Sequence, residues 1–133
     1  MVMVLIGVLA VFAAPRMLDL TAWRLRAFTD AVQAETLAMQ RRAAIQRRPI
    51  TATIVGTGIS FSDATSTLAT VACPAAASPC IAEAGPRSVT FNAAHSGRAS
   101  TSTGSALTLT IGSGSAQRRL AIAHETGLIH PLP

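Results

Sequence analysis

The feature that most constrains this chain is its first fourteen residues, MVMVLIGVLAVFAA, which contain no polar side chain. A helix built from this run is apolar on every side and needs an apolar surrounding. At 1.5 Å per residue it extends about 21 Å, which is shorter than the bilayer hydrocarbon core of about 30 Å. Three interpretations follow: the core of a signal peptide, a buried core helix, or a membrane span whose beginning is missing.

We favour the third interpretation. No basic segment precedes the run, as it would in a signal peptide, and the sequence after it continues as helix. Pro15 follows the run, and membrane helices tolerate proline although it removes one backbone hydrogen bond. We therefore expect residues 1–15 to form a transmembrane or filament-core helix segment.

Beyond Pro15, apolar residues recur at intervals of 7, 3, 4 and 7, which places them on one side of a helix. This apolar stripe consists of Leu18, Leu25, Phe28, Val32 and Met39. A second, smooth face that allows close packing consists of Ala27, Ala31, Ala34 and Ala38. No strong helix breaker appears before Pro49, so residues 16–48 are predicted to be an amphipathic stalk. One helix from the start of the chain to about residue 46 would be about 68 Å long.

The charge of the chain is concentrated in this helix. The net charge is +5, and all eleven basic residues are arginine, seven of them within residues 1–48. The remainder of the chain has only four arginines against three acidic residues. A solvated helix face explains this distribution more simply than a nucleic-acid partner does.

After Pro49 the periodicity changes from helical to alternating, and Thr, Ser and Gly become frequent. The expected strands are ITATIV (50–55), ISFS (59–62), TLATVAC (67–73), SVTFN (88–92), ALTLTI (106–111), RRLAIAH (118–124) and a short return at 128–130. The first two read as a hairpin around Gly56 and Gly58, and Glu125-Thr126-Gly127 reads as a turn. The fold class is therefore α+β: a long N-terminal helix packed on a small antiparallel sheet, with residues 49–133 as the head.

The two cysteines, Cys73 and Cys80, frame the sequence CPAAASPC. Six intervening residues suit neither a CxxC redox motif nor a zinc knuckle. We expect a disulfide; two unpaired thiols are the alternative.

Nothing in the sequence predicts catalysis. His95, His124 and His130 are far apart, although the last two flank the final turn and, with Glu125, could be drawn as a metal site. Surface histidines explain them better, because the strand register that would align them is unknown. There is no nucleophile elbow and no phosphate loop. We expect no enzyme activity, cofactor, metal or small-molecule substrate.

The order of these segments resembles the type IV pilin superfamily. MVMVLIGVLAVFAAPRM is similar to the second part of a pilin N-terminal segment, with Gly7 and Pro15 at the usual separation. Residues 26–54 and 89–100 are similar to the GspH/FimT family, and LAIAHETGLIH (120–130) is similar to the final hairpin of minor pilins of the MSHA pilus. A prepilin cleavage site and the usual glutamate would lie upstream of Met1, so we expect the start to have been placed too late.

The resemblance implies a structural minor pilin or pseudopilin rather than an enzyme. Such a subunit would lie in the bacterial inner membrane with a single span and its head in the periplasm. It would then join a type IV pilus or a type II secretion pseudopilus through contacts with other pilins. The residues expected to anchor and assemble it are Val2, Val4, Leu5, Ile6, Gly7, Val8, Leu9, Val11, Phe12 and Pro15. A plain membrane anchor without assembly is the blander interpretation.

The resemblance also carries an alternative function, because some FimT-like minor pilins bind DNA for uptake through arginines of the head. The candidates here are Arg98, Arg118 and Arg119. No aromatic residue accompanies them for base stacking, and the head carries little net charge. DNA contact is therefore the less favoured interpretation.

Overall fold

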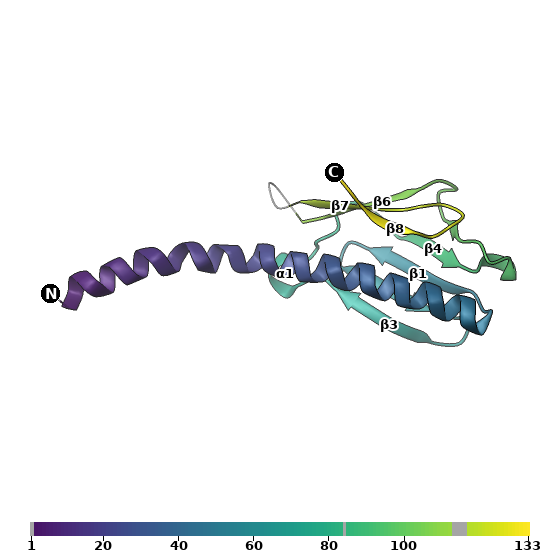
Figure 1. Ribbon diagram of the computed structural model, residues 1–133, viewed down its shortest axis with the longest axis horizontal. Coiled ribbons are helices and arrows are strands. Elements are labelled where there is room, and N and C mark those ends of the chain that lie inside the picture. Colours follow the sequence, from purple (N-terminus) through teal and green to yellow (C-terminus); the bar gives the residue numbers. More distant parts are fainter. Residues whose placement is uncertain (1, 84, 113–116) are drawn as a thin grey trace.

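The computed structural model describes residues 2–83, 85–112 and 117–133, and within α1 it leaves residues 12–19 without described side chains. In these residues the chain is α+β, as predicted: one long helix, α1 (Val2–Gln46), packs on antiparallel β-structure. Figure 1 shows that the C-terminal part of α1 lies along the head while its N-terminal part projects beyond it. The head therefore covers only part of the helix.

The predicted apolar stripe is the side of α1 that packs against the head. Leu25, Phe28, Val32 and Met39 are all buried, whereas Leu18 falls among the side chains outside the described set. Two threonines join the stripe, Thr29 and Thr36. The hydroxyl of Thr29 donates to the carbonyl of Leu25 at 2.9 Å, so this polar group is satisfied within the helix.

The residue that follows the helix has a left-handed backbone conformation. Arg47 has a φ of 53°, and the Arg48 N–H donates to the Ala43 carbonyl at 3.2 Å across the last turn. This is the hydrogen-bond pattern of a Schellman cap, and Pro49 then prevents the helix from continuing. The cap turns the chain back along the helix into the first strand.

We predict that Arg47→Gly stabilises the protein, because a side chain at positive φ costs about 1 kcal/mol that glycine avoids. Ile45→Gly is the matched control, since it lies inside the last helical turn and should destabilise by about 1 kcal/mol. Urea unfolding of the full chain measures both variants. A destabilising effect of Arg47→Gly would contradict the cap.

The first sheet has five strands in the order β3-β2-β1-β4-β5. They are β1 (Ile50–Val55), β2 (Gly58–Ser62), β3 (Thr67–Ala72), β4 (Arg87–Phe91) and β5 (Ser100–Thr101). The hairpin expected around Gly56 and Gly58 is confirmed as the antiparallel pair β1–β2. Short 3₁₀ turns, η1 (Ala75–Ala77) and η2 (Ala93–His95), lie in the connections before and after β4.

The remaining strands form a second sheet, which the sequence did not distinguish from the first. Its order is β6 (Leu107–Ile111), β7 (Arg118–Ile122) and β8 (Ile129–Leu132). The segment after the disulfide, rather than β5, lies along β6, with a bridge between Ile81 and Ile111. The predicted final hairpin is confirmed, and Gly127 has a φ of 68° at its turn, where a Cβ would come within 2.8 Å of the Phe91 ring.

Alternation along the strands supplies the core. The inward positions of both sheets are buried and pack around the stripe of α1 in one cluster. Its largest fully buried side chains include Phe61, Phe91, Ile50, Leu109 and Leu120. The helix is thus held by two sheets at once, which fixes the direction in which its N-terminal part projects.

Candidate functional site

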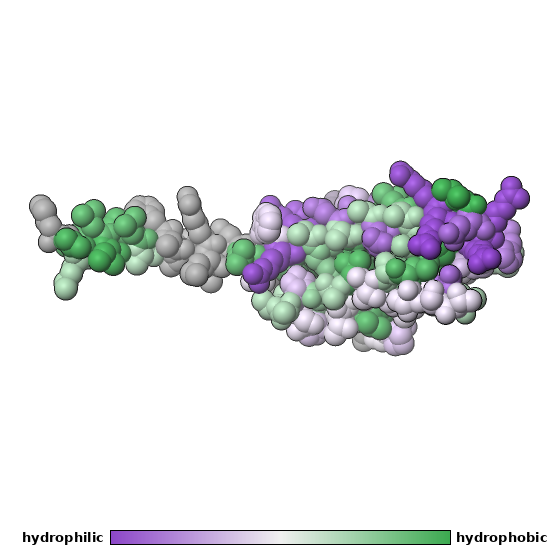
Figure 2. Space-filling view, turned by 90° about the horizontal axis from the view of Figure 1, so that it is seen from below, coloured by the Kyte–Doolittle hydropathy of each residue, from purple (hydrophilic) through white to green (hydrophobic). Residues whose placement is uncertain are grey.

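The most exposed apolar surface of the molecule is the start of α1. We call Val2–Val11 the foot. Its large side chains are exposed by 50 to 88 %, and a Cβ added at Gly7 would meet no atom within 4 Å. Figure 2 shows the foot as an apolar projection clear of the head. Phe12 and Pro15, also predicted to serve assembly, lie outside the described side chains.

Burying the exposed side chains of the foot would release a large free energy. Burying a Val, Leu, Ile or Met side chain contributes about 1.5–3 kcal/mol, so the eight such residues of the foot leave on the order of 10–20 kcal/mol unrealised in water. Continuous apolar surface of this kind marks an interaction site rather than a normal solvent face. The foot is therefore the first candidate site.

The predicted membrane location is wrong. In the part of the chain that the structure describes, no helix is long and apolar enough to cross a membrane. The described apolar side chains of the foot span only about 15 Å, roughly half of the hydrocarbon thickness of a bilayer. This finding contradicts the expectation of a single-pass inner-membrane protein with a periplasmic head.

A second apolar surface runs up α1 on the side away from the head, and we call it the outer stripe. It contains the four alanines predicted to form a smooth face, and all four are exposed. Larger apolar side chains share this side: Trp23 is 66 % exposed and Ile45 82 %. The members of the outer stripe are Leu20, Trp23, Ala27, Ala31, Ala34, Ala38 and Ile45.

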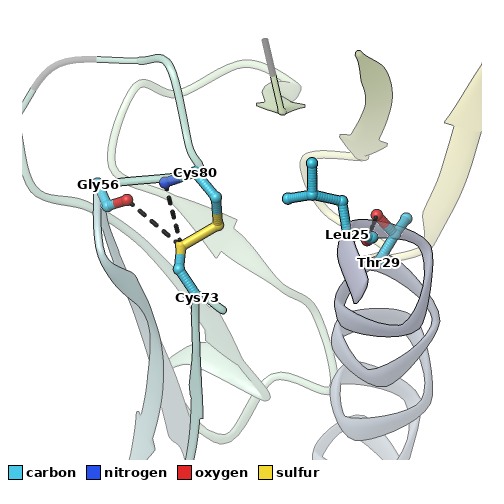
Figure 3. Close-up of a disulfide and its surroundings, with 5 residues drawn as sticks. All are labelled: Leu25, Thr29, Gly56, Cys73 and Cys80. Atoms are coloured by element: carbon cyan, nitrogen blue, oxygen red, sulfur yellow. Dashed lines mark hydrogen bonds between the residues drawn. A yellow bond between two sulfur atoms is a disulfide. The ribbon is translucent and has the colours of Figure 1, made fainter. Parts of the chain in front are cut away.

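The predicted disulfide between Cys73 and Cys80 is confirmed. It is buried in the core cluster that also contains Leu25 of α1. Figure 3 shows the Cys80 N–H directed at the Cys73 sulfur, at 3.2 Å, and the Gly56 carbonyl beside the same sulfur. The bond closes the loop after β3 and ties it to the start of the segment that leads to the second sheet.

We predict that Cys73→Ala combined with Cys80→Ala lowers the free energy of unfolding by about 2 kcal/mol, because the unfolded chain loses the constraint of a short closed loop. Reduction of the unmutated protein with dithiothreitol is the control and should lower it by a similar amount. Urea unfolding midpoints report both. Equal stability of oxidised and reduced protein would contradict the prediction.

The three arginines proposed for DNA contact do not lie together. Arg118 and Arg119 are exposed at the start of β7 and line an open groove of about 640 Å³ with Thr29 and Asp30 of α1. Arg98 belongs to the loop after β4, which packs on the other end of the helix near Ala43. Fourteen residues of helix separate these two places, which corresponds to about 21 Å.

Arg98 lies instead in a loop that contacts the C-terminal end of α1. The His95 ring nitrogen Nδ1 is 2.9 Å from the Arg47 carbonyl, and the Asn92 amide donates to the Ala43 carbonyl at 3.4 Å. These contacts fasten the loop that carries Arg98 onto the turn that carries Arg47 and Arg48. We call these three exposed arginines the basic tip.

One carboxylate lies at the basic tip. Asp63 shares a cleft with Arg48 and His95. The Thr65 N–H, the Thr65 hydroxyl and the Ser66 N–H all donate to it and lower its pKa from 3.8 to about 2. Asp63 is therefore ionised at neutral pH and offsets part of the positive charge. The salt bridge found among the described residues, between Arg87 and Glu83, lies elsewhere.

That Arg87–Glu83 pair is a feature that the sequence analysis missed. Both carboxylate oxygens of Glu83 accept from the Thr110 N–H, at 2.8 and 2.9 Å, and the Arg87 guanidinium donates to the Thr108 carbonyl at 2.8 Å. The carboxylate thus accepts the backbone hydrogen bond that a neighbouring strand would otherwise accept from β6. The spacing of four residues between the two charges was the only signal for it in the sequence.

The histidines are divided among separate places. His124 Nδ1 is 2.9 Å from the Thr101 hydroxyl, His95 contacts the helix end, and His130 is exposed on β8. Within the described residues no group of three or more metal-binding side chains occurs. The final hairpin pairs Ala121 with His130, so the histidine pair drawn from the sequence is not a cross-strand pair.

Comparison with known proteins yields no match to a family model, a curated protein or a solved structure.

Proposed function

We propose that this chain is a pilin-like subunit that assembles into a filament, a type IV pilus or a type II secretion pseudopilus, by packing its foot against the helices of other copies or other pilins. The observation that carries the proposal is the foot itself: ten consecutive residues, apolar apart from Gly7, project from a folded head with their side chains in solvent. The sequence motifs that resemble the GspH/FimT family, residues 26–54 and 89–100, support the proposal as a resemblance of sequence.

Helix packing accounts for the composition of the foot. Two helices approach to about 8–10 Å when small residues interrupt the larger ones, and Gly7 and Ala10 supply such positions. The foot has no polar stripe, so it offers apolar side chains in every direction. All apolar side chains of such a helix are removed from water only when other helices surround it, as in the centre of a filament. A single partner helix leaves part of its apolar surface in water.

The outer stripe supports the same arrangement. It lies on the side of α1 that the head leaves open, and its alanines permit close approach along the stalk. The head packs on the opposite side of the helix, so helices can gather without a clash between heads. Arg24 and Arg41 flank the outer stripe, which suits a contact that is less completely buried than the foot.

We predict that Ile6→Arg abolishes assembly. Burying an unpaired guanidinium costs at least about 3 kcal/mol, which corresponds to more than a 100-fold loss in the association constant of one contact. The measurement is pelleting and negative-stain electron microscopy of the full chain after removal of detergent.

Leu128→Arg is the matched control for Ile6→Arg, because Leu128 is an exposed apolar residue of the head, 51 % accessible. It should assemble as the unmutated protein does. Filaments of normal length and yield from Ile6→Arg would reject the foot as the interface.

A second function, DNA contact, gains support from one observation. Arg47 and Arg48 follow the end of α1 farthest from the foot, the loop that carries Arg98 contacts this end, and no ion pair is found there among the described residues. Three arginines that neutralise three phosphates give a salt dependence of about −2.7 in log K against log salt concentration. The basic tip replaces the trio first considered, since Arg118 and Arg119 lie about 20 Å away along the helix.

We predict that Arg98→Ala and Arg48→Ala each weaken binding of the full chain to a duplex DNA fragment several-fold at low salt. Each should also reduce the salt slope by about 1. Arg118→Ala is the control and should leave both quantities unchanged. Fluorescence anisotropy between 25 and 200 mM salt, chosen as about a decade of ionic strength, tests this. Absence of binding at low salt, or an equal effect of Arg118→Ala, would reject the basic tip as a DNA site.

A further inference from the structure

Most side chains on the solvent face of the five-stranded sheet are hydroxyls, and the apolar residues Val55 and Ala72 lie at one end of it. The strand register places the hydroxyls in two rows, of which the first crosses all five strands and the second crosses four strands and ends at Ser102, just after β5. The first row is Thr67, Ser62, Thr51, Thr90 and Ser100. The second row is Thr70, Ser60, Thr53, Ser88 and Ser102. We call these ten residues the hydroxyl face.

The hydroxyl face points away from α1. The residues that alternate with it along β1, namely Ile50, Ala52 and Ile54, are buried on the helix side of the sheet. Nine of the ten hydroxyl residues lie in strands. The tenth, Ser102, follows β5, and its N–H donates to the Ser88 carbonyl at 2.8 Å. In Figure 2 pale side chains predominate along the lower part of the head, and strongly hydrophilic ones gather at its far end.

The ten positions of the hydroxyl face share one composition, threonine and serine. None of the ten positions is charged, in a chain whose charged residues make up 13% of the sequence. Strand propensity explains threonine here, but serine is not among the residues that strands favour. The two rows contain no large apolar side chain, and Val55 and Ala72 lie beyond the second row.

We propose that the hydroxyl face binds a neutral polysaccharide chain that lies along the rows, across the strands. Each Ser or Thr hydroxyl can donate one hydrogen bond and accept two, and sugar hydroxyls can do the same. Either partner can therefore act as the donor in a hydrogen bond between them. Adjacent strands place the hydroxyls about 4.8 Å apart, which is close to the length of one sugar ring. The Thr51 and Thr90 hydroxyls lie 3.1 Å apart, so neighbours within a row already reach one another.

Charge and shape exclude other partners. A nucleic acid or an acidic peptide finds no cation among the ten positions, and a hydrophobic protein surface finds no large apolar side chain among them. Adjacent strands rotate by roughly 20–25°, so five strands turn the rows through about 80–100°. A flat crystalline surface would meet only part of such a twisted face, whereas a single flexible chain can follow it.

The proposed filament leaves this face open, because α1 packs on the opposite side of the sheet. Each exposed hydrogen bond contributes little against competition from water, so one copy binds weakly. Many copies in a filament raise the effective affinity by multivalency. Binding by a single copy does not depend on assembly, and the two proposals therefore fail separately.

The test is retention of the full chain, kept unassembled in a detergent without a sugar head group, on insoluble amylose and on amorphous, swollen cellulose. Alginate, an acidic polysaccharide, is run beside them. Thr53→Val combined with Thr90→Val removes two central hydroxyls while preserving shape and strand propensity. We expect binding to at least one neutral polymer and a tenfold or greater loss in this double variant.

Thr108→Val combined with Thr110→Val makes the same chemical change on β6 of the other sheet, and this variant should bind as the unmutated chain does. Three results would overturn the proposal. These are absence of retention on both neutral polymers, equal retention of the two double variants, and stronger retention on alginate than on amylose and cellulose.

Discussion

The packing of one side of α1 against two sheets determines what the rest of the molecule presents to its surroundings. Leu25, Phe28, Val32 and Met39 insert into the core that both sheets share, and this contact fixes the helix relative to the head. The same contact ends near Leu25, and the side chains of the foot are exposed in the part of the chain that the structure describes. The head holds the C-terminal part of α1 in place, while the apolar side chains of the foot stay exposed to water. Burying these side chains against another helix would be favourable, and this is the physical reason to expect assembly.

The surface divides into three regions of different chemistry, each placed by the fold. The apolar foot lies at one end of α1, and the basic tip lies at the other end, where the loop after β4 is fastened to the helix cap. The hydroxyl face lies on the side of the first sheet that the helix does not touch. Assembly through the foot and outer stripe would leave the other two regions accessible, so the three proposed contacts are compatible in space.

The sequence predicted the elements of this fold well, because each one leaves a local pattern. The 7-3-4-7 spacing identified the buried side of α1, and strict alternation identified strands such as β6. Pairing between distant segments has no such pattern. The division into two sheets depends on whether β5 or the segment after Cys80 lies along β6, and the carboxylate of Glu83 takes part in that choice. The grouping of Arg98 with Arg47 and Arg48, and the two hydroxyl rows, likewise appear only when the register between strands is known.

The most direct test of the account is the distance between feet of neighbouring copies in assembled material. A single spin label at Val8→Cys, with the Cys73–Cys80 disulfide kept oxidised, reports this distance by double electron–electron resonance. Packed helices lie about 8–10 Å apart, so labels on adjacent copies should be separated by about 20 Å or less, and the signal should vanish when detergent separates the copies. Labels that stay far apart in assembled material, or a foot that folds back onto its own head, would contradict the account.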